Sequence, residues 1–283
     1  MLIVDSQVHV WAAEPADHPW PRPLAAPVQG PGPFLPDDLL AAMDAAGVDR
    51  AVLVPPSWEG HRNALALAAA RLHPGRFAVM GRLPIEAPES RDRFDEWRFL
   101  PGMLGARLNF RRGAVRWLRD GTADWIWRAA ERDGLALMLF VNEDFPAVAT
   151  IAERHPGLRL VIDHLGVGVE HKGPEAFAHL PALLRLARHG NIAVKASAMP
   201  CAAADAFPHA SLHPYLRAAF DAFGPHRMFW GSDLTRLSCP YRDCVSMFTD
   251  HLPWLAGEEL ALVMGKALCA WLRWPADRIG RPA

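Results

Sequence analysis

Short apolar runs rich in β-branched residues alternate along the chain with longer segments of helical periodicity. The pattern predicts eight strands, at 2–5, 51–55, 77–83, 104–109, 135–141, 158–163, 191–196 and 227–231. It predicts eight helices between and after them, at 37–46, 62–73, 89–98, 122–133, 144–155, 174–189, 212–223 and 241–254. Strands that alternate with helices form a parallel sheet, and eight such repeats are enough to close a (β/α)8 TIM barrel. An extra C-terminal helix, from Gly257 to Trp274, is predicted to pack outside the barrel.

One connection breaks this rhythm. The segment from His18 to Pro36 contains seven prolines and follows the first strand. A loop of this length at the mouth of a barrel strand is typical of an active-site lid or wall. The alternative is a passive loop with polyproline character.

Composition and charge narrow the class of protein. The chain has 283 residues, of which 51% are hydrophobic and 22% charged, so we expect one barrel domain over residues 1–283 with a large core. A formal net charge of −1 does not indicate the excess of positive charge that is typical of proteins that bind nucleic acid or a membrane surface. The N-terminus lacks the features of a signal peptide, and the four cysteines form no Cys-x-x-Cys pair. We therefore expect a cytoplasmic protein with free thiols.

The first strand and its exit carry polar residues in alternation. With a side-chain period of two, Asp5, Gln7 and His9 share one face. The opposite face, where helices would pack, carries Val4, Val8 and Val10. Polar side chains on the inner face at the top of a barrel strand lie where substrate binds.

Two further strands end in residues that could carry chemistry. The sixth ends in Asp163 and His164, and the eighth ends shortly before Asp233. Each of these residues alone could be structural, but a closed barrel brings all the strand ends together. Two imidazoles and a carboxylate at one mouth could hold a metal or activate a water molecule directly.

Basic and aromatic residues at the same strand ends suggest the kind of substrate. Arg107 and Lys195 lie on strands, and Arg236 follows Asp233. Cations directed into a barrel mouth are typical of carboxylate or phosphate binding, whereas Arg111 and Arg112 are also consistent with solvated loop charges. Trp11 and Trp58 follow the first and second strands, and either could form a wall beside a ring-shaped substrate.

These strand ends resemble the motifs of the amidohydrolase superfamily. The segment Asp5-Ser6-Gln7-Val8-His9 is similar to its Asp-x-His-x-His strand, with Gln7 in place of the first histidine. The segments 161–166, 191–197 and 230–233 resemble its sixth, seventh and eighth strands, the last ending in the catalytic aspartate. The likeness spans nearly the whole chain and is greatest to the amidohydrolase-related branch. That branch includes sugar lactonases, 2-pyrone-4,6-dicarboxylate lactonase and metal-dependent aromatic-acid decarboxylases.

The resemblance leaves two options for a cofactor. Besides Gln7, the fifth strand departs from the pattern, because it carries no histidine or lysine where metal-dependent members have one. His9, His164 and Asp233 could still bind a single divalent metal, zinc or manganese. The pyrone-dicarboxylate lactonase works without a metal, and we favour a metal-free site over a metal-bound one.

The resulting hypothesis is the hydrolysis of a lactone or similar cyclic ester that bears a carboxylate. Asp233 would activate water, His9 and His164 would polarise the carbonyl, and Lys195 would assist at the oxyanion or hold the negative group. The remaining substrate-binding candidates are Gln7, Arg107, Trp11, Trp58 and Arg236.

Two alternatives remain open. One is a metal-dependent, non-oxidative decarboxylase of an aromatic or unsaturated acid. The other is a non-catalytic barrel that binds a small acid. In each case the expected partner is a small molecule, and a homodimer is an open alternative to a monomer.

Overall fold

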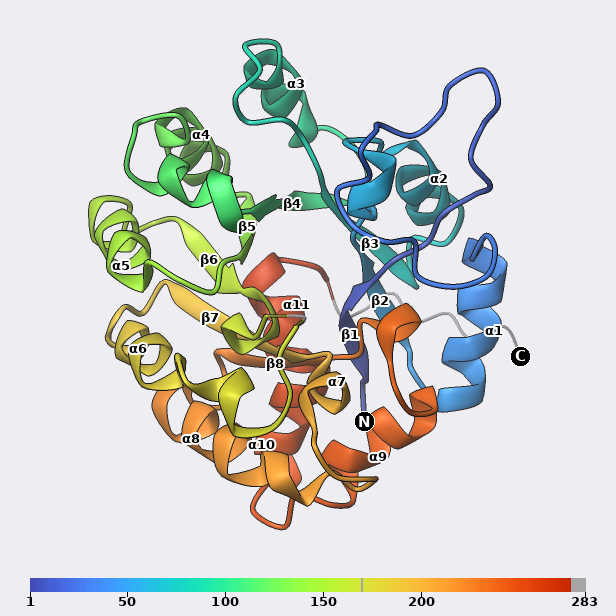
Figure 1. The fold of residues 1–283 in the computed structure, drawn as a ribbon, viewed down its shortest axis with the longest axis vertical. Helices are drawn as coiled ribbons and strands as arrows, with labels where there is room; N and C mark the ends of the chain where they lie inside the picture. The colour runs from blue at the N-terminus through green and yellow to red at the C-terminus, as the bar shows by residue number, and fades with distance from the viewer. Residues whose placement is uncertain (169, 276–283) are drawn as a thin grey trace.

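Eight parallel strands form the centre of the computed structural model, which describes residues 1–168 and 170–275. They are β1 (Val4–Val8), β2 (Arg50–Leu53), β3 (Phe77–Gly81), β4 (Met103–Asn109), β5 (Ala136–Phe140), β6 (Arg159–Ile162), β7 (Ile192–Ser197) and β8 (Met228–Gly231). Each strand pairs with the next along the chain, and helices surround the sheet (Figure 1). The predicted TIM barrel is confirmed.

The helices in the described part of the chain lie close to their predicted positions except in two places, and they include one short helix, α7 (Met199–Ala202), that the sequence pattern does not predict. They are α1 (Pro36–Ala46), α2 (Ala64–Leu72), α3 (Ser90–Trp97), α4 (Asp124–Asp133), α5 (Phe145–Arg154), α6 (Leu180–Leu184), α7 (Met199–Ala202), α8 (His213–Phe223), α9 (Tyr241–Thr249), α10 (Gly257–Ala261) and α11 (Ala267–Leu272). The prediction of one helix over 174–189 is wrong: two short 3-10 segments flank α6 there. Pro181 lacks an N–H and its ring disfavours a continuous helix through this point. The predicted helix 241–254 ends at Thr249, four residues before Pro253.

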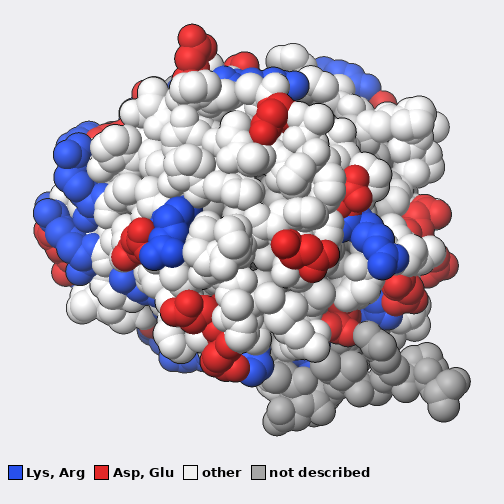
Figure 2. All heavy atoms as spheres, turned by 90° about the horizontal axis from the view of Figure 1, so that it is seen from below, with Lys and Arg blue, Asp and Glu red and all other residues white. Residues whose placement is uncertain are grey.

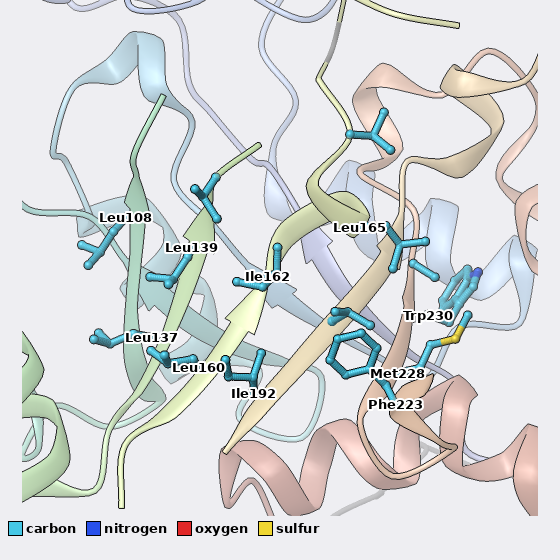
Figure 3. Close-up of a cluster of buried hydrophobic side chains, with 14 of the residues drawn as sticks. Leu108, Leu137, Leu139, Leu160, Ile162, Leu165, Ile192, Phe223, Met228 and Trp230 are labelled. Atoms are coloured by element: carbon cyan, nitrogen blue, oxygen red, sulfur yellow. The ribbon is translucent and has the colours of Figure 1, made fainter. Parts of the chain in front are cut away.

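Apolar side chains between the strands and the helices form the larger core. Leu137 and Leu139 of β5 lie beside Leu160 and Ile162 of β6 in this layer (Figure 3). All four are fully buried. Full burial of a leucine or isoleucine stabilises a fold by about 1.5–3 kcal/mol, so this layer holds the helices on the barrel.

A second apolar cluster fills the barrel interior and is closed by α11. Val52, Met138 and Val161 from the strands pack with Leu268 and Leu272 of α11. Arg159, the first residue of β6, donates to the carbonyl oxygen of Trp271 at 2.6 Å, so α11 lies at the N-terminal end of the strands. Figure 1 shows this helix near the centre of the barrel. The predicted C-terminal helix is confirmed, and it lies across the N-terminal end of the barrel because the apolar interior needs a cover there.

Between β8 and β1 the barrel is joined by individual hydrogen bonds. The backbone N–H of Asp233 donates to the carbonyl of Gln7 (3.0 Å), and that of Ser232 donates to the Asp5 carboxylate (2.9 Å). The register of β1 shifts between Asp5 and Val8. Because of this bulge, Val4 belongs to the interior cluster while Val8 belongs to the outer one. The predicted face of Val4, Val8 and Val10 is thus wrong for Val4.

The proline-rich loop packs against the mouth. Trp20 of the loop forms a cluster with Trp11 and Trp58, and Leu24, Val28 and Phe34 pack against this cluster. Trp11 and Phe34 also pair through two backbone hydrogen bonds of 2.9 and 3.0 Å. The loop therefore forms a wall beside the exit of β1.

The distribution of surface charge and the state of the cysteines are consistent with the near-zero net charge and the absence of a Cys-x-x-Cys pair. On the face shown in Figure 2, basic and acidic side chains are interspersed, with no extended field of one sign. All four cysteines are free thiols. None of the helices in the described part of the chain is long and apolar enough to cross a membrane.

Candidate active site

Three consecutive strands leave the barrel through residues with left-handed backbone conformation. His164 follows β6 with φ 54°, Ala198 follows β7 with φ 58°, and Asp233 follows β8 with φ 53°. This conformation is uncommon for residues other than glycine and costs about 1–3 kcal/mol when the surroundings impose it. The strained turns bring the side chains of His164 and Asp233 together at the mouth.

His9 and Asp233 form the closest contact of the predicted trio. His9 Nε2 lies 3.1 Å from Asp233 Oδ1, and His9 Nδ1 lies 2.6 Å from the carbonyl oxygen of Val54. Since a carbonyl only accepts, the ring donates to Val54 from Nδ1. This hydrogen bond fixes the ring with Nε2 toward the Asp233 carboxylate.

His164 lies on the other side of Asp233. Its Nε2 is 3.8 Å from Asp233 Oδ2, and its Nδ1 is 2.8 Å from Ser197 Oγ. Burial lowers the pKa of His164 to about 4, although Asp233 and Asp163 act in the opposite direction. This ring is therefore neutral near pH 7.

The Asp233 carboxylate is almost fully buried yet ionised. Burial raises its pKa, but His9, then His164 and Arg236, outweigh burial and hold the pKa well below its ordinary value. Arg236 Nη1 lies 3.5 Å from Asp233 Oδ2. The structure thus brings His9, His164, Asp233 and Arg236 together, as the sequence pattern predicts.

A buried chain of polar groups supports His164 from below. Lys195 Nζ lies 2.8 Å from Asp163 Oδ1 and donates to Gln7 Oε1 at 2.8 Å. Arg107 Nε donates to Asp163 Oδ2 at 2.9 Å. Burial opposes ionisation of Asp163, but Lys195 and Arg107 outweigh it and lower the pKa of Asp163 to about 2. Lys195 and Arg107 are therefore paired cations, bound to a shared carboxylate.

The orientation of Gln7 decides whether the trio suits a metal. Lys195 is a donor only, so it fixes the amide with Oε1 toward itself and Nε2 toward His164 Nε2, 3.2 Å away. The Gln7 amide then donates to the nitrogen that would bind a metal. In the described parts of the chain, no group of three or more His, Cys, Asp or Glu side chains could hold a metal ion. The donor set does not fit a metal centre of His9, His164 and Asp233.

The two predicted aromatic residues form the wall beside His9. The Trp58 ring lies 6.1 Å from the His9 ring in an edge-on arrangement, and Trp11 packs edge-on against Trp58 at 5.2 Å. Both indoles are buried. Trp58 is thus adjacent to the trio, while Trp11 lies behind it.

Asp5, although it precedes Gln7 in the motif, serves a different part of the molecule. Its carboxylate accepts hydrogen bonds from the hydroxyl groups of Ser232 and Tyr241, the latter at 2.7 Å from α9. Burial raises the pKa of Asp5, and these hydrogen bonds act against the rise. The expectation that Asp5, Gln7 and His9 share one face is wrong for Asp5, because the bulge in β1 reverses the alternation.

The sequence pattern does not single out Arg82, Ser197 or Tyr241. Ser197 is hydrogen-bonded to His164, and Tyr241 contacts Asp5 from a helix distant in sequence. Arg82 is a buried cation directly after β3. A charged residue that interrupts the predicted strand 77–83 is a signal that could have identified it.

Comparison with known proteins places these features in a family. A model of the amidohydrolase family matches residues 4–276. A curated L-fucono-1,5-lactonase of Burkholderia ambifaria is 29% identical over 260 residues, which cover 89% of this chain and 85% of that protein.

Two solved structures share the fold. An amidohydrolase of Burkholderia multivorans with bound zinc has a TM-score of 0.78 and 25% identity, and the match covers 97% of this chain and 100% of that one. A probable 2-pyrone-4,6-dicarboxylic acid hydrolase of Acinetobacter baumannii with bound citric acid has a TM-score of 0.75 and 18% identity, covering 96% and 100%. The predicted resemblance to sugar lactonases and to pyrone-dicarboxylate lactonase is confirmed.

Proposed function

Since the chain belongs to the amidohydrolase family, we propose that it hydrolyses a lactone or similar cyclic ester, with Asp233 as the general base. The observation that carries this proposal is the convergence of an ionised, buried Asp233 with His9 at 3.1 Å and His164 at 3.8 Å. The likeness to an L-fucono-1,5-lactonase supports a cyclic ester as the substrate.

Asp233 accepts the proton of the attacking water. Its carboxylate is ionised because His9, His164 and Arg236 lower its pKa, so it is available as a base at neutral pH. The groups that lower its pKa also make it a weak base while they stay close to it. Movement of His9 Nε2 from Asp233 toward the substrate oxygen would strengthen the base as the water attacks.

His9 stabilises the developing oxyanion. The Val54 carbonyl fixes the His9 ring, so that its Nε2–H is directed into the mouth. Water adds to the lactone carbonyl carbon, and the bond from that carbon to the ring oxygen then breaks. The ring oxygen leaves with the proton that Asp233 took from water, which gives a hydroxy acid and restores the carboxylate.

Lys195 and Gln7 act as positioning residues in this scheme. Lys195 orients the Gln7 amide, and the amide donates to His164 Nε2. This keeps His164 neutral with its proton on Nδ1, where Ser197 Oγ can accept it. We propose that hydrolysis proceeds without a metal, because the Gln7 amide already donates to His164 Nε2, the nitrogen that would bind a metal. The decarboxylase alternative depends more on a metal and is less compatible with this donor set.

Replacement of Asp233 by asparagine tests the proposal. Asp233→Asn keeps the shape of the side chain but removes the base, so we expect kcat on a panel of lactones to fall by at least about 10³-fold. The matched control is Asp221→Asn, at an exposed residue of α8 that pairs with Arg217 on the surface.

Circular dichroism would verify that both variants are folded. Asp233→Asn with more than a tenth of the wild-type kcat would contradict the assignment of the base. The same assay after dialysis against a chelator tests the metal-free part. Full activity in protein that elemental analysis finds free of metal is the expected result, and loss of activity restored by zinc would overturn that part.

A further inference from the structure

A cavity lies at the mouth, beside the ends of β3 and β4. Its volume is about 210 Å³, and its lining includes His61, Arg82, Arg107, Asn109 and Arg111. Glu86, the carboxylate of this lining, is exposed. Three guanidinium groups around one cavity create a positive potential that is typical of anion sites.

Arg82 is the least satisfied of these cations. Its side chain is 7% exposed, and its Nε donates to the carbonyl of Gly60 at 3.2 Å. Its Nη1 is buried and has no hydrogen-bond partner among the described residues. A buried N–H donor without an acceptor is costly, which indicates that something else satisfies it.

The position of Arg82 is fixed by its backbone. Asn63 accepts from the Arg82 N–H at 2.8 Å and donates to the Arg82 carbonyl at 2.9 Å. Burial, together with the nearby charge of Arg107, lowers the pKa of Arg82 to about 9, so the group is still a cation at neutral pH. Arg82 is thus an immobilised cation that lies close to a second cation, Arg107.

The other two arginines lie on the side of the cavity that faces the Phe140 ring. Arg107 uses its Nε for Asp163, whereas Arg111 is already paired with Glu170 at 2.6 Å. The guanidinium groups of Arg107 and Arg111 lie 4.7 and 4.6 Å from the centre of the Phe140 ring. That ring packs edge-on against His164 at 5.3 Å. One aromatic side chain therefore separates the arginine cluster from His164.

We propose that Arg82 and Arg107 bind a carboxylate carried by the lactone ring, and that Arg82 determines specificity for acidic over neutral lactones. This inference rests on the proposed lactone hydrolysis and names its substrate class. A carboxylate supplies the acceptor that Arg82 Nη1 lacks and neutralises the repulsion between the two guanidinium groups. A neutral hydroxymethyl or methyl substituent supplies neither.

The test uses pairs of lactones with the same ring and stereochemistry. In each pair one member ends in a carboxylate and the other in a hydroxymethyl group. We expect wild-type protein to favour the carboxylate member in kcat/KM. Arg82→Gln should lower this preference by about 10- to 100-fold, because a charge-assisted hydrogen bond is lost. Arg82→Lys, which keeps the charge but not the planar fork, should fall between the two.

Arg71→Gln is the matched control, since Arg71 is an exposed arginine of α2. It should leave the preference at the wild-type value. Thermal melting would establish that the Arg82 variants are folded, and Arg82→Lys covers the case in which Arg82→Gln does not fold. An unchanged preference in both Arg82 variants would overturn the inference.

Calorimetry with the open-chain hydroxy acids separates this inference from the proposed reaction. Wild-type protein should bind the dicarboxylate members more tightly than the monocarboxylate members, and Arg82→Gln should remove this difference. If the dicarboxylates bind in this way but no lactone is hydrolysed, the carboxylate site stands and the lactonase proposal fails. If lactones are hydrolysed while neither preference nor binding depends on Arg82, the lactonase proposal stands and the carboxylate site fails.

Discussion

The two ends of the barrel interior are formed by the same strands, but one end is apolar and the other is charged. At the N-terminal end, Val161 of β6 and Ala193 of β7 lie in an apolar cluster that α11 closes. Two residues further along, Asp163 and Lys195 form a buried ion pair at 2.8 Å. One step of the strand period therefore separates a dry core from a charged site.

The difference shows how stability and chemistry are divided. The apolar end gains free energy from burial without any directional requirement. The charged end has large desolvation costs, which are offset only because each charge has a partner, and it also contains the left-handed turns at His164 and Asp233. Burial at the apolar end and in the outer core must therefore offset the free-energy cost of the charged groups and the strained turns at the mouth.

Breaking the ion pair at the charged end should have the largest effect on stability. Lys195→Met leaves Asp163 with Arg107 alone and releases Gln7, so we expect the free energy of unfolding to fall by about 3–5 kcal/mol. Chemical denaturation measures this loss. Lys266→Met, at an exposed lysine paired with Glu258, is the control and should change stability by less than about 1 kcal/mol. Equal effects of the two variants would mean that burial of the Lys195 pair is not what holds the mouth together.

Opening a void at the apolar end should cost less and leave the chemistry intact. Leu268→Ala removes a fully buried side chain of α11, and we expect a loss of about 3 kcal/mol in the free energy of unfolding. The kcat/KM of the folded protein should stay at the wild-type value, because α11 lies at the end opposite the trio. Leu72→Ala, at a leucine that is 74% exposed, should have almost no effect on stability. A large fall in kcat/KM for Leu268→Ala would show that the two ends are coupled.

The smallest expected effect concerns the pH dependence of stability at the charged end. His164 has a pKa of about 4 in the folded protein and about 6.5 when unfolded, so between these values the unfolded chain binds one more proton. Stability from this residue is present above pH 6.5 and is lost as the pH falls toward 4, by about 2 kcal/mol between pH 7.5 and 5. His164→Asn should remove that part of the dependence when unfolding is measured at both pH values. A wild-type slope in the variant would show that His164 is not buried as a neutral ring.

Several features of the molecule are readable from residue order alone. Alternating apolar and helical segments specify a β/α repeat, and eight repeats specify closure, because each strand buries both faces and each helix one. The polar interruptions at Gln7, His9, Asp163, His164 and Asp233 identify strand ends, since buried polar groups cannot be placed at random. The break at Pro181 is different, because the pattern there predicts one helix over 174–189 and the structure divides it.

Other features could not be read because they depend on residues that meet only after folding. The bulge in β1 turns Val4 toward the barrel interior and directs Asp5 toward Tyr241, which lies 236 positions further along the chain. A period-two pattern of residues predicts neither the bulge nor this contact. The placement of α11 follows from the shape of the open barrel end rather than from the helix itself. A helix needs an apolar surface, but its sequence does not say which surface.

Residue order is enough to specify the barrel, the family likeness and the residues that meet at the mouth. The contacts among those residues depend on the folded structure. Lys195 can orient Gln7, and Gln7 can occupy His164 Nε2, only because three strands bring them within 3.2 Å. Protonation and ligand-binding capacity follow from distance and burial, and both are properties of the folded chain rather than of its residue order.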